Sequence, residues 1–149
     1  MPSRRRVLLS ALCLCCTWGH AQTIGFELQT PQDSPIALVT FAPSAFRTAS
    51  DRRQFFTVKN NSDKVTAAVV FQQTLSNASK PEIVALERVS IVIRPREKKR
   101  LSISVRDVWE RIHAAVQAGE AHGKPVLSVA VVEFIDGTAW NAPLDRAHE

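Results

Sequence analysis

The chain has 149 residues, of which 19 are Lys or Arg and 14 are Asp or Glu, so its formal net charge is +5. Its first 21 residues combine the basic stretch Arg4 to Arg6 with an apolar run from Val7 to about Trp18 and a small-residue exit ending at Ala21. This pattern is typical of a cleaved export signal, and the run is shorter than the roughly 20 residues that span a bilayer. Cleavage removes three arginines and lowers the net charge to +2, which takes away the main support for nucleic-acid binding.

The leader also predicts the compartment. Residues 22–149 have the length of one domain, which we expect in the periplasm of a bacterium or outside the cell. The segment 3–9, SRRRVLL, resembles the twin-arginine export motif, so this route is an alternative to ordinary export of the unfolded chain. Cys13, Cys15 and Cys16 all lie in the leader, and we favour a cleaved signal over a lipid anchor because Cys13 and Cys15 each follow leucine. A mature chain without thiols excludes disulfides, cysteine metal sites and cysteine nucleophiles.

Short runs rich in Val, Ile, Phe and Thr follow, separated by turn-type clusters. They predict strands at 36–41, 54–59, 65–75, 83–93, 100–105, 126–134 and 138–141. In 101–105, LSISV, apolar and polar residues alternate, which is the period of a half-buried strand. About seven strands with turns at this spacing predict an all-β fold, an antiparallel sandwich formed by the single domain 22–149.

One segment, about 105–118, has helical spacing instead. Its apolar positions are Val105, Val108, Trp109, Ile112 and Val116. Ser104, followed three residues later by Asp107, predicts an N-terminal cap, and Gly119 predicts a left-handed end of the helix. We expect a crossover helix over an open end of the sandwich, with Trp109 and Ile112 facing the core.

This order of elements resembles immunoglobulin-like or fibronectin-type-III-like sandwiches of bacterial envelope proteins. The resemblance rests on the Asn-Asn-Ser-Asp turn at 60–63 between two strands, on the Ile-Arg-Pro-Arg-Glu segment 93–97 before an alternating strand, and on the helical crossover with its final hairpin. It covers residues 36–143 and implies an immunoglobulin-like fold without implying an activity.

The final hairpin contains the pair Asp136-Gly137 between two apolar runs. Glycine adopts the positive φ of a tight type I′ turn, so the pair predicts a hairpin. Glu133 and Asp136 offer too few oxygens for a convincing cation site. Trp140 is expected to pack on the sandwich or its crossover helix, with an exposed contact residue as the alternative.

Two polar segments are candidate contact surfaces. The segment 95–100 places four basic residues within six, which suits anionic lipid, polysaccharide or nucleic acid, but it also suits a solvated turn, which we favour. Lys98 and Lys99 would also protect an edge strand from pairing with other chains. Loop 42–53 carries Arg47, Arg52 and Arg53 and is either a partner contact or a solvated connection. The sequence does not decide whether the basic turn 94–100 or loop 42–53 is functional.

The sequence offers little chemistry. His113, His122 and His148 are too few and too scattered to predict a zinc site. The chain lacks a nucleophile elbow, a His-Glu-x-x-His motif, a phosphate-cradling loop and an EF-hand loop. We therefore predict no catalytic residue, metal or cofactor. A hydrolase would require His113 or His122 beside a buried carboxylate.

These observations predict a non-enzymatic exported protein that binds another envelope protein or supports the envelope. Recognition would use the loops at one end of the sandwich or the addition of a partner strand to an exposed edge. The alternative is a periplasmic small-ligand or metal-binding protein with a site between the crossover helix and the sandwich end, in a pocket lined by Trp109 with His113 nearby. We expect neither a nucleic-acid partner nor a transmembrane segment, and the oligomeric state stays open.

Overall fold

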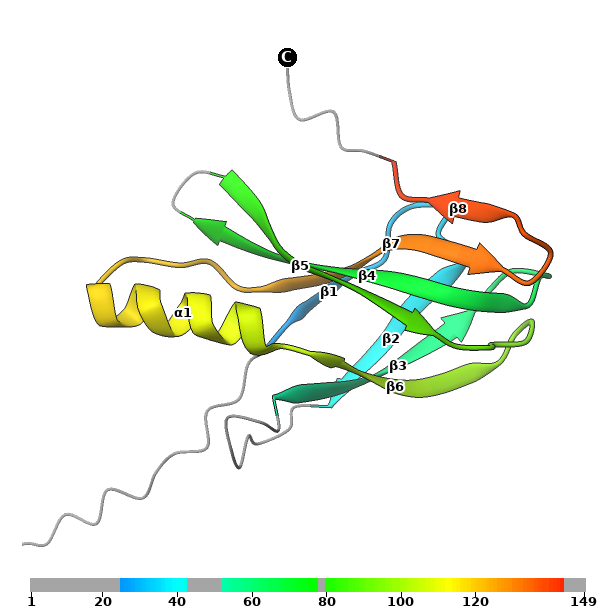
Figure 1. Ribbon diagram of the computed structural model, residues 1–149, viewed down its shortest axis with the longest axis horizontal. Helices are drawn as coiled ribbons and strands as arrows, with labels where there is room; N and C mark the ends of the chain where they lie inside the picture. Colours follow the sequence, from blue (N-terminus) through cyan, green and yellow to red (C-terminus); the bar gives the residue numbers. More distant parts are fainter. Residues whose placement is uncertain (1–24, 43–51, 78–79, 144–149) are drawn as a thin grey trace, which may run out of the picture.

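The computed structural model describes residues 25–42, 52–77 and 80–143, which form two packed β-sheets and one helix (Figure 1). The larger sheet has the strand order β1 (Glu27–Gln29), β7 (Val126–Phe134), β4 (Thr66–Asn77) and β5 (Lys80–Ser90), and β8 (Ala139–Asn141) also pairs with β7. The smaller sheet has the order β2 (Ile36–Ala42), β3 (Arg53–Asn60) and β6 (Lys98–Ser104). The expected all-β sandwich is confirmed.

Most neighbouring strands run antiparallel, and β1 is the exception because it lies parallel to the start of β7. All seven predicted strands are present, whereas β1 was not predicted. The predicted strand 83–93 is shifted, because β5 ends at Ser90. The next residues cross toward the smaller sheet, with the N–H of Ile91 bonded to Ala67 O and the carbonyl of Ile93 accepting from Thr66 N.

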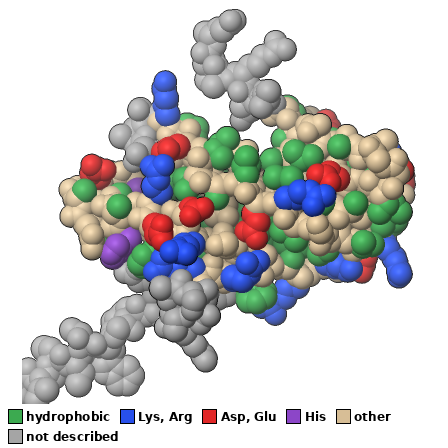
Figure 2. Space-filling model, in the orientation of Figure 1, with side chains coloured by type: hydrophobic (Ala, Val, Ile, Leu, Met, Phe, Trp, Pro, Cys, Tyr) green, Lys and Arg blue, Asp and Glu red, His purple; other side chains and the backbone are tan. Residues whose placement is uncertain are grey.

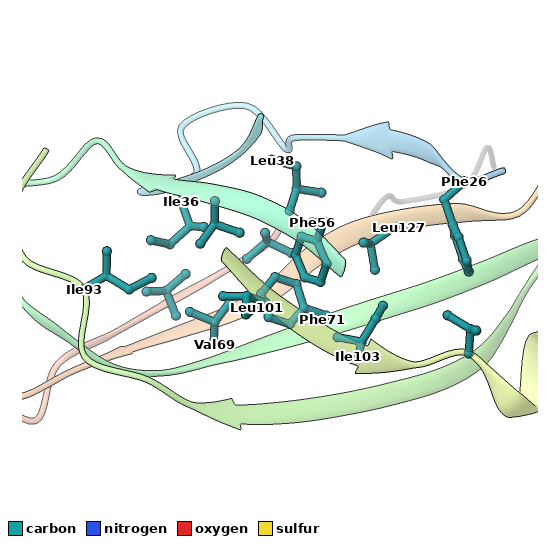
Figure 3. Close-up of a cluster of buried hydrophobic side chains, with 14 of the residues drawn as sticks. Phe26, Ile36, Leu38, Phe56, Val69, Phe71, Ile93, Leu101, Ile103 and Leu127 are labelled. Carbon is teal, nitrogen blue, oxygen red and sulfur yellow. The ribbon is translucent and has the colours of Figure 1, made fainter. Parts of the chain in front are cut away.

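Alternation along the strands gives each sheet one apolar face. In β3, Phe56 and Val58 are buried while Phe55 is exposed, which is the period-two pattern of a strand with one covered face. Phe56 meets Phe71 of β4 edge to face, with ring centroids 5.0 Å apart and planes at 86°. Figure 3 shows these two rings at the centre of a cluster of apolar side chains that come from both sheets.

A buried polar turn ties the sheets together at the end opposite the helix. The side chain of Asn60 donates to the carbonyl oxygens of Lys64 and Ile93 at 2.7 and 2.9 Å, and it accepts from the N–H and hydroxyl of Ser62 at 2.9 and 2.7 Å. Thr66 is also buried, and its hydroxyl donates to Ile91 O and accepts from Ile93 N. These bonds satisfy backbone groups that the crossover from β5 to β6 would otherwise bury without partners.

The predicted crossover helix is α1 (Arg106–Ala118), which lies at one end of the sandwich and runs lengthwise beside the projecting end of β4 and β5 (Figure 1). Val108 and Ala115 are buried, and Trp109 and Ile112 pack partly buried against the core. The helix ends at Gly119, whose φ is 69°, as predicted. The predicted Ser104–Asp107 cap is wrong: the N-cap residue is Val105 and no side chain caps it, because Ser104 still belongs to strand β6.

The hairpin between β7 and β8 is present, but its turn is not type I′. Gly137 has a φ of 82°, whereas Asp136 does not have a positive φ. The N–H of Gly137 bonds to Phe134 O at 3.0 Å and the N–H of Phe134 bonds to Thr138 O at 2.9 Å. This is a three-residue loop with glycine in the left-handed position. Trp140 packs against the core, as expected.

Candidate functional site

A groove of about 270 Å³ lies between α1 and the projecting end of the β4–β5 hairpin. We call it the helix–hairpin groove. Its apolar lining comes from Leu75 and Val84 of the hairpin and from three alanines of the helix. Its charged lining residues are Glu82, Arg111 and Glu120. A concave apolar surface with a few polar groups is the usual form of a binding site.

The groove exists because the helix presents small side chains to the hairpin. Ala114, Ala115 and Ala118 are spaced one, three and four positions apart, so they share one face of a helix with 3.6 residues per turn. Leucines at these positions would fill the space between the helix and the hairpin. The three alanines thus leave an unfilled space between α1 and the end of the larger sheet.

The loop after α1 is anchored to the hairpin by a close backbone approach. The N–H of Gly123 donates to Ser76 O at 2.8 Å. A Cβ at position 123 would stand 2.8 Å from Ser76 Cβ, so only glycine fits without a shift. This contact holds the loop against the end of β4 and fixes one wall of the helix–hairpin groove.

The charged lining of the groove is acidic on balance. Arg111 Nη2 lies 3.0 Å from Glu82 Oε1, and both side chains are about half exposed. Glu120 forms no ion pair with any residue in the part of the chain that the structure describes. An exposed pair such as Glu82–Arg111 contributes little to stability, but it neutralises the arginine and leaves Glu120 as the uncompensated charge.

Strand β5 forms one wall of the groove and is an edge strand. Among the described strands it pairs only with β4. Ile83 and Leu86 point away from the core on its outer face and are 55% and 61% exposed. The register with β4 skips Val84, which makes a β-bulge beside the groove. The edge therefore presents apolar side chains next to the groove.

The predicted pocket residues Trp109 and His113 do not line this groove. Their rings stack 4.7 Å apart with an interplanar angle of 10°. The guanidinium of Arg52 lies 3.3 Å from the centroid of the Trp109 ring. Trp109 and His113 fall on a different face of α1 from Ala114 and Ala118. The contact between Arg52 and Trp109 holds the residue that precedes β3 against the helix.

The histidines and carboxylates singled out in the sequence are dispersed. His113 Nε2 lies 2.9 Å from the side-chain nitrogen of Gln117, and His122 Nδ1 lies 3.1 Å from Gly123 O. Both histidines are exposed, and neither touches a carboxylate within residues 25–42, 52–77 and 80–143. His148 falls outside the described residues. Over the same ranges, no three His, Cys, Asp or Glu side chains are grouped as metal ligands.

Glu133 and Asp136 are each held by a basic partner and do not converge. Arg88 binds Glu133 at 2.6 Å, and this contact lowers the pKa of Glu133. Asp136 accepts hydrogen bonds from Thr138 and lies 2.9 Å from Lys64 Nζ, which together lower its pKa to about 2. The Glu133 carboxylate therefore links β7 to β5, and the Asp136 carboxylate stabilises the hairpin between β7 and β8.

One described arginine in each of the two polar segments is engaged within the fold. Arg53 donates a hydrogen bond to Ser102 O, and its Nη2 lies 3.5 Å from Glu87 Oε1. Arg96, which has a φ of 67°, donates to the carbonyl oxygen of Asn61 and forms an ion pair with Asp63. Arg47 lies outside the described residues. The arginines flanking β3 and the turn before β6 therefore have structural partners.

Within the described ranges, no helix is long and apolar enough to cross a membrane. Comparison of the chain with models of protein families, with curated proteins and with solved structures gives no match. The function must therefore be argued from the groove and the surfaces around it.

Proposed function

We propose that the chain is a non-enzymatic binding module of the bacterial cell envelope that captures a segment of another envelope protein at the helix–hairpin groove. The observation that carries this proposal is a groove lined by apolar and charged side chains beside an edge strand with exposed Ile83 and Leu86. Protein interfaces are commonly anchored by one large side chain in such a depression, with further apolar contact around it.

The groove has room for one protein side chain. Its volume is about 270 Å³, near the lower end of the range of about 300–1,000 Å³ that is usual for pockets of drug-sized molecules. One leucine, methionine or phenylalanine side chain fits such a volume. The exposed apolar residues of β5 then offer a continuation of the contact for the chain on either side of the anchor.

The charges around the groove indicate which residues should flank the apolar anchor side chain in the partner protein. Glu120 and the Glu82–Arg111 pair give the rim one net negative charge. A partner with Lys or Arg next to its apolar anchor would complement this rim, and an acidic partner would be repelled. We therefore expect an apolar-basic segment in the partner.

The surroundings of the two described histidines suit a binding role better than a catalytic one. The exposed histidines His113 and His122 contact an amide side chain and a backbone carbonyl, so neither is positioned by a carboxylate as a catalytic base usually is. The proposed work of the chain is recognition.

The proposal is tested by filling the groove. Residues 22–149, which contain every described element, serve as bait in envelope extract, and captured proteins are identified by mass spectrometry. Ala118→Trp places a large side chain in the groove and should abolish capture. Gln117→Trp is the matched control, because it adds the same group one position away at an exposed site that does not line the groove.

Equal capture by both variants would show that the groove is not the binding site. Loss of capture in both, with both still folded by circular dichroism, would also contradict the proposal, because it would place the contact elsewhere on the helix. Displacement of the partner by a small molecule from the extract would favour the periplasmic ligand-binding alternative.

A further inference from the structure

The two sheets differ in charge. The three strands of the smaller sheet carry five basic side chains and no acidic one: Arg53, Lys59, Lys98, Lys99 and Arg100. The strands of the larger sheet carry four acidic side chains, Glu27, Glu82, Glu87 and Glu133, and two basic ones, Lys80 and Arg88. Figure 2 shows Lys and Arg side chains projecting at the lower right of the molecule and at other places on the face in view. The strands of the smaller sheet thus carry a net positive charge, whereas those of the larger sheet carry a net negative one.

The register between β3 and β6 brings three of these basic residues onto the solvent face. Lys59 pairs directly with Lys98, and Arg100 pairs with Thr57 in the next row of the same face. Among the described residues, none of the three basic side chains has a carboxylate partner. Like charges directly opposite each other destabilise an antiparallel pair. An arrangement that costs stability is a sign of function.

The same face also exposes apolar side chains. Phe55 and Val39 are 39% and 40% exposed, and the Arg100 guanidinium lies 4.7 Å from the centroid of the Phe55 ring. Phe55 lies two positions before Thr57 on the outer side of β3, so it is adjacent to the basic row. Basic residues around exposed apolar groups are typical of surfaces that rest on lipid bilayers.

We propose that the outer face of the smaller sheet docks on an anionic lipid bilayer. Lys59, Lys98 and Arg100 would contact the anionic headgroups, and Phe55 and Val39 would enter the interface between headgroups and acyl chains. The face is a sheet surface without an acidic residue in its strands, which fits an extended negative surface. A nucleic acid is less well matched, because stacking on a base requires an open aromatic face and Arg100 lies over the ring of Phe55.

This surface is separate from the helix–hairpin groove, so the two proposals fail independently. Docking is measured by cosedimentation of residues 22–149 with vesicles of phosphatidylglycerol and phosphatidylcholine, and with vesicles of phosphatidylcholine alone. Lys59→Gln combined with Lys98→Gln should weaken binding to the anionic vesicles by roughly 25-fold, since each basic residue near such a surface contributes about fivefold. Lys80→Gln combined with Lys124→Gln removes the same charge from exposed sites elsewhere and should change binding much less.

The proposal is supported if the wild type binds anionic vesicles strongly at about 0.1 M salt and loses this binding at about 1 M salt. It also requires that vesicle binding is weakened selectively in the variant with Lys59→Gln and Lys98→Gln. Three results would overturn it: no binding to anionic vesicles, equal weakening in both double variants, or preferential binding to soluble polyglutamate, which would identify an acidic protein as the partner. Circular dichroism checks that the Lys59 and Lys98 variant is folded. It should be at least as stable as wild type, because the opposed lysines are gone.

Discussion

Replacing Asn60 by alanine is expected to destabilise the fold by about 3 kcal/mol, worked from its four side-chain hydrogen bonds. One of these bonds, to Ile93 O, is buried and contributes about 1 kcal/mol. The other three are partly buried and contribute about 0.7 kcal/mol each. Ile93 O keeps a second donor, Thr66 N, so it is not left without a partner.

The assay is urea unfolding of residues 22–149, followed by circular dichroism and tryptophan fluorescence. Asn61→Ala is the matched control, because Asn61 is exposed and is held by its backbone; its change should stay within about 0.5 kcal/mol. The Asn60 variant should melt roughly 10 °C lower than wild type, at about 3–5 °C per kcal/mol for a domain of this size. A loss below about 1 kcal/mol, or a loss equal to that of the control, would refute the view that this side chain joins the two sheets.

Three further predictions concern the ends of the sandwich. Gly137→Ala should cost about 1 kcal/mol, because alanine disfavours a φ of 82° although its Cβ would meet open space; Gly25→Ala, without a positive φ, should be neutral in the same thermal melts. The lowered pKa of Asp136 stabilises the folded state above pH 3.8, the ordinary pKa of the group, and this stabilisation is lost as the pH falls from 3.8 to about 2. Asp136→Asn should therefore lose less stability over this pH range than wild type does. An unchanged acid profile would contradict the bonds from Thr138 and Lys64. Arg52→Ala should shift the emission of Trp109 to longer wavelength and lower stability by about 1–2 kcal/mol, and an unchanged spectrum would contradict the stacking.

Local patterns were sufficient to predict most of the fold. Apolar runs between turn residues, several of them alternating, predicted seven strands that are present, although 83–93 was placed three residues too late. The three-and-four spacing predicted α1, because both periods are set by the backbone. Strand β1 was missed because its three residues, Glu27–Gln29, alternate too briefly to be recognised and are fixed by parallel pairing with β7. The hairpin turn was assigned the wrong type because Asp136 is held by Thr138 and Lys64, and Lys64 lies far away in sequence.

The candidate surfaces could be predicted only in part. The sequence pattern indicates a possible site between the helix and the sandwich end, which is where the helix–hairpin groove lies, but it predicts Trp109 and His113 as lining residues, which is wrong. The groove depends on small residues such as Ala118 and on the reach of the β4–β5 hairpin, neither of which has a sequence signature. The basic segment 95–100 was noticed, yet its pairing with Lys59 depends on the register of β3 with β6.

The central claim, capture of a protein segment in the helix–hairpin groove, is tested most directly by site-specific photocrosslinking. A benzophenone amino acid is placed at position 118, inside the groove, or at position 117, one residue outside it. Both versions of residues 22–149 are irradiated in envelope extract. The account predicts a discrete crosslinked protein from position 118 and none from position 117. The same crosslink from both positions, or from position 117 alone, would contradict it.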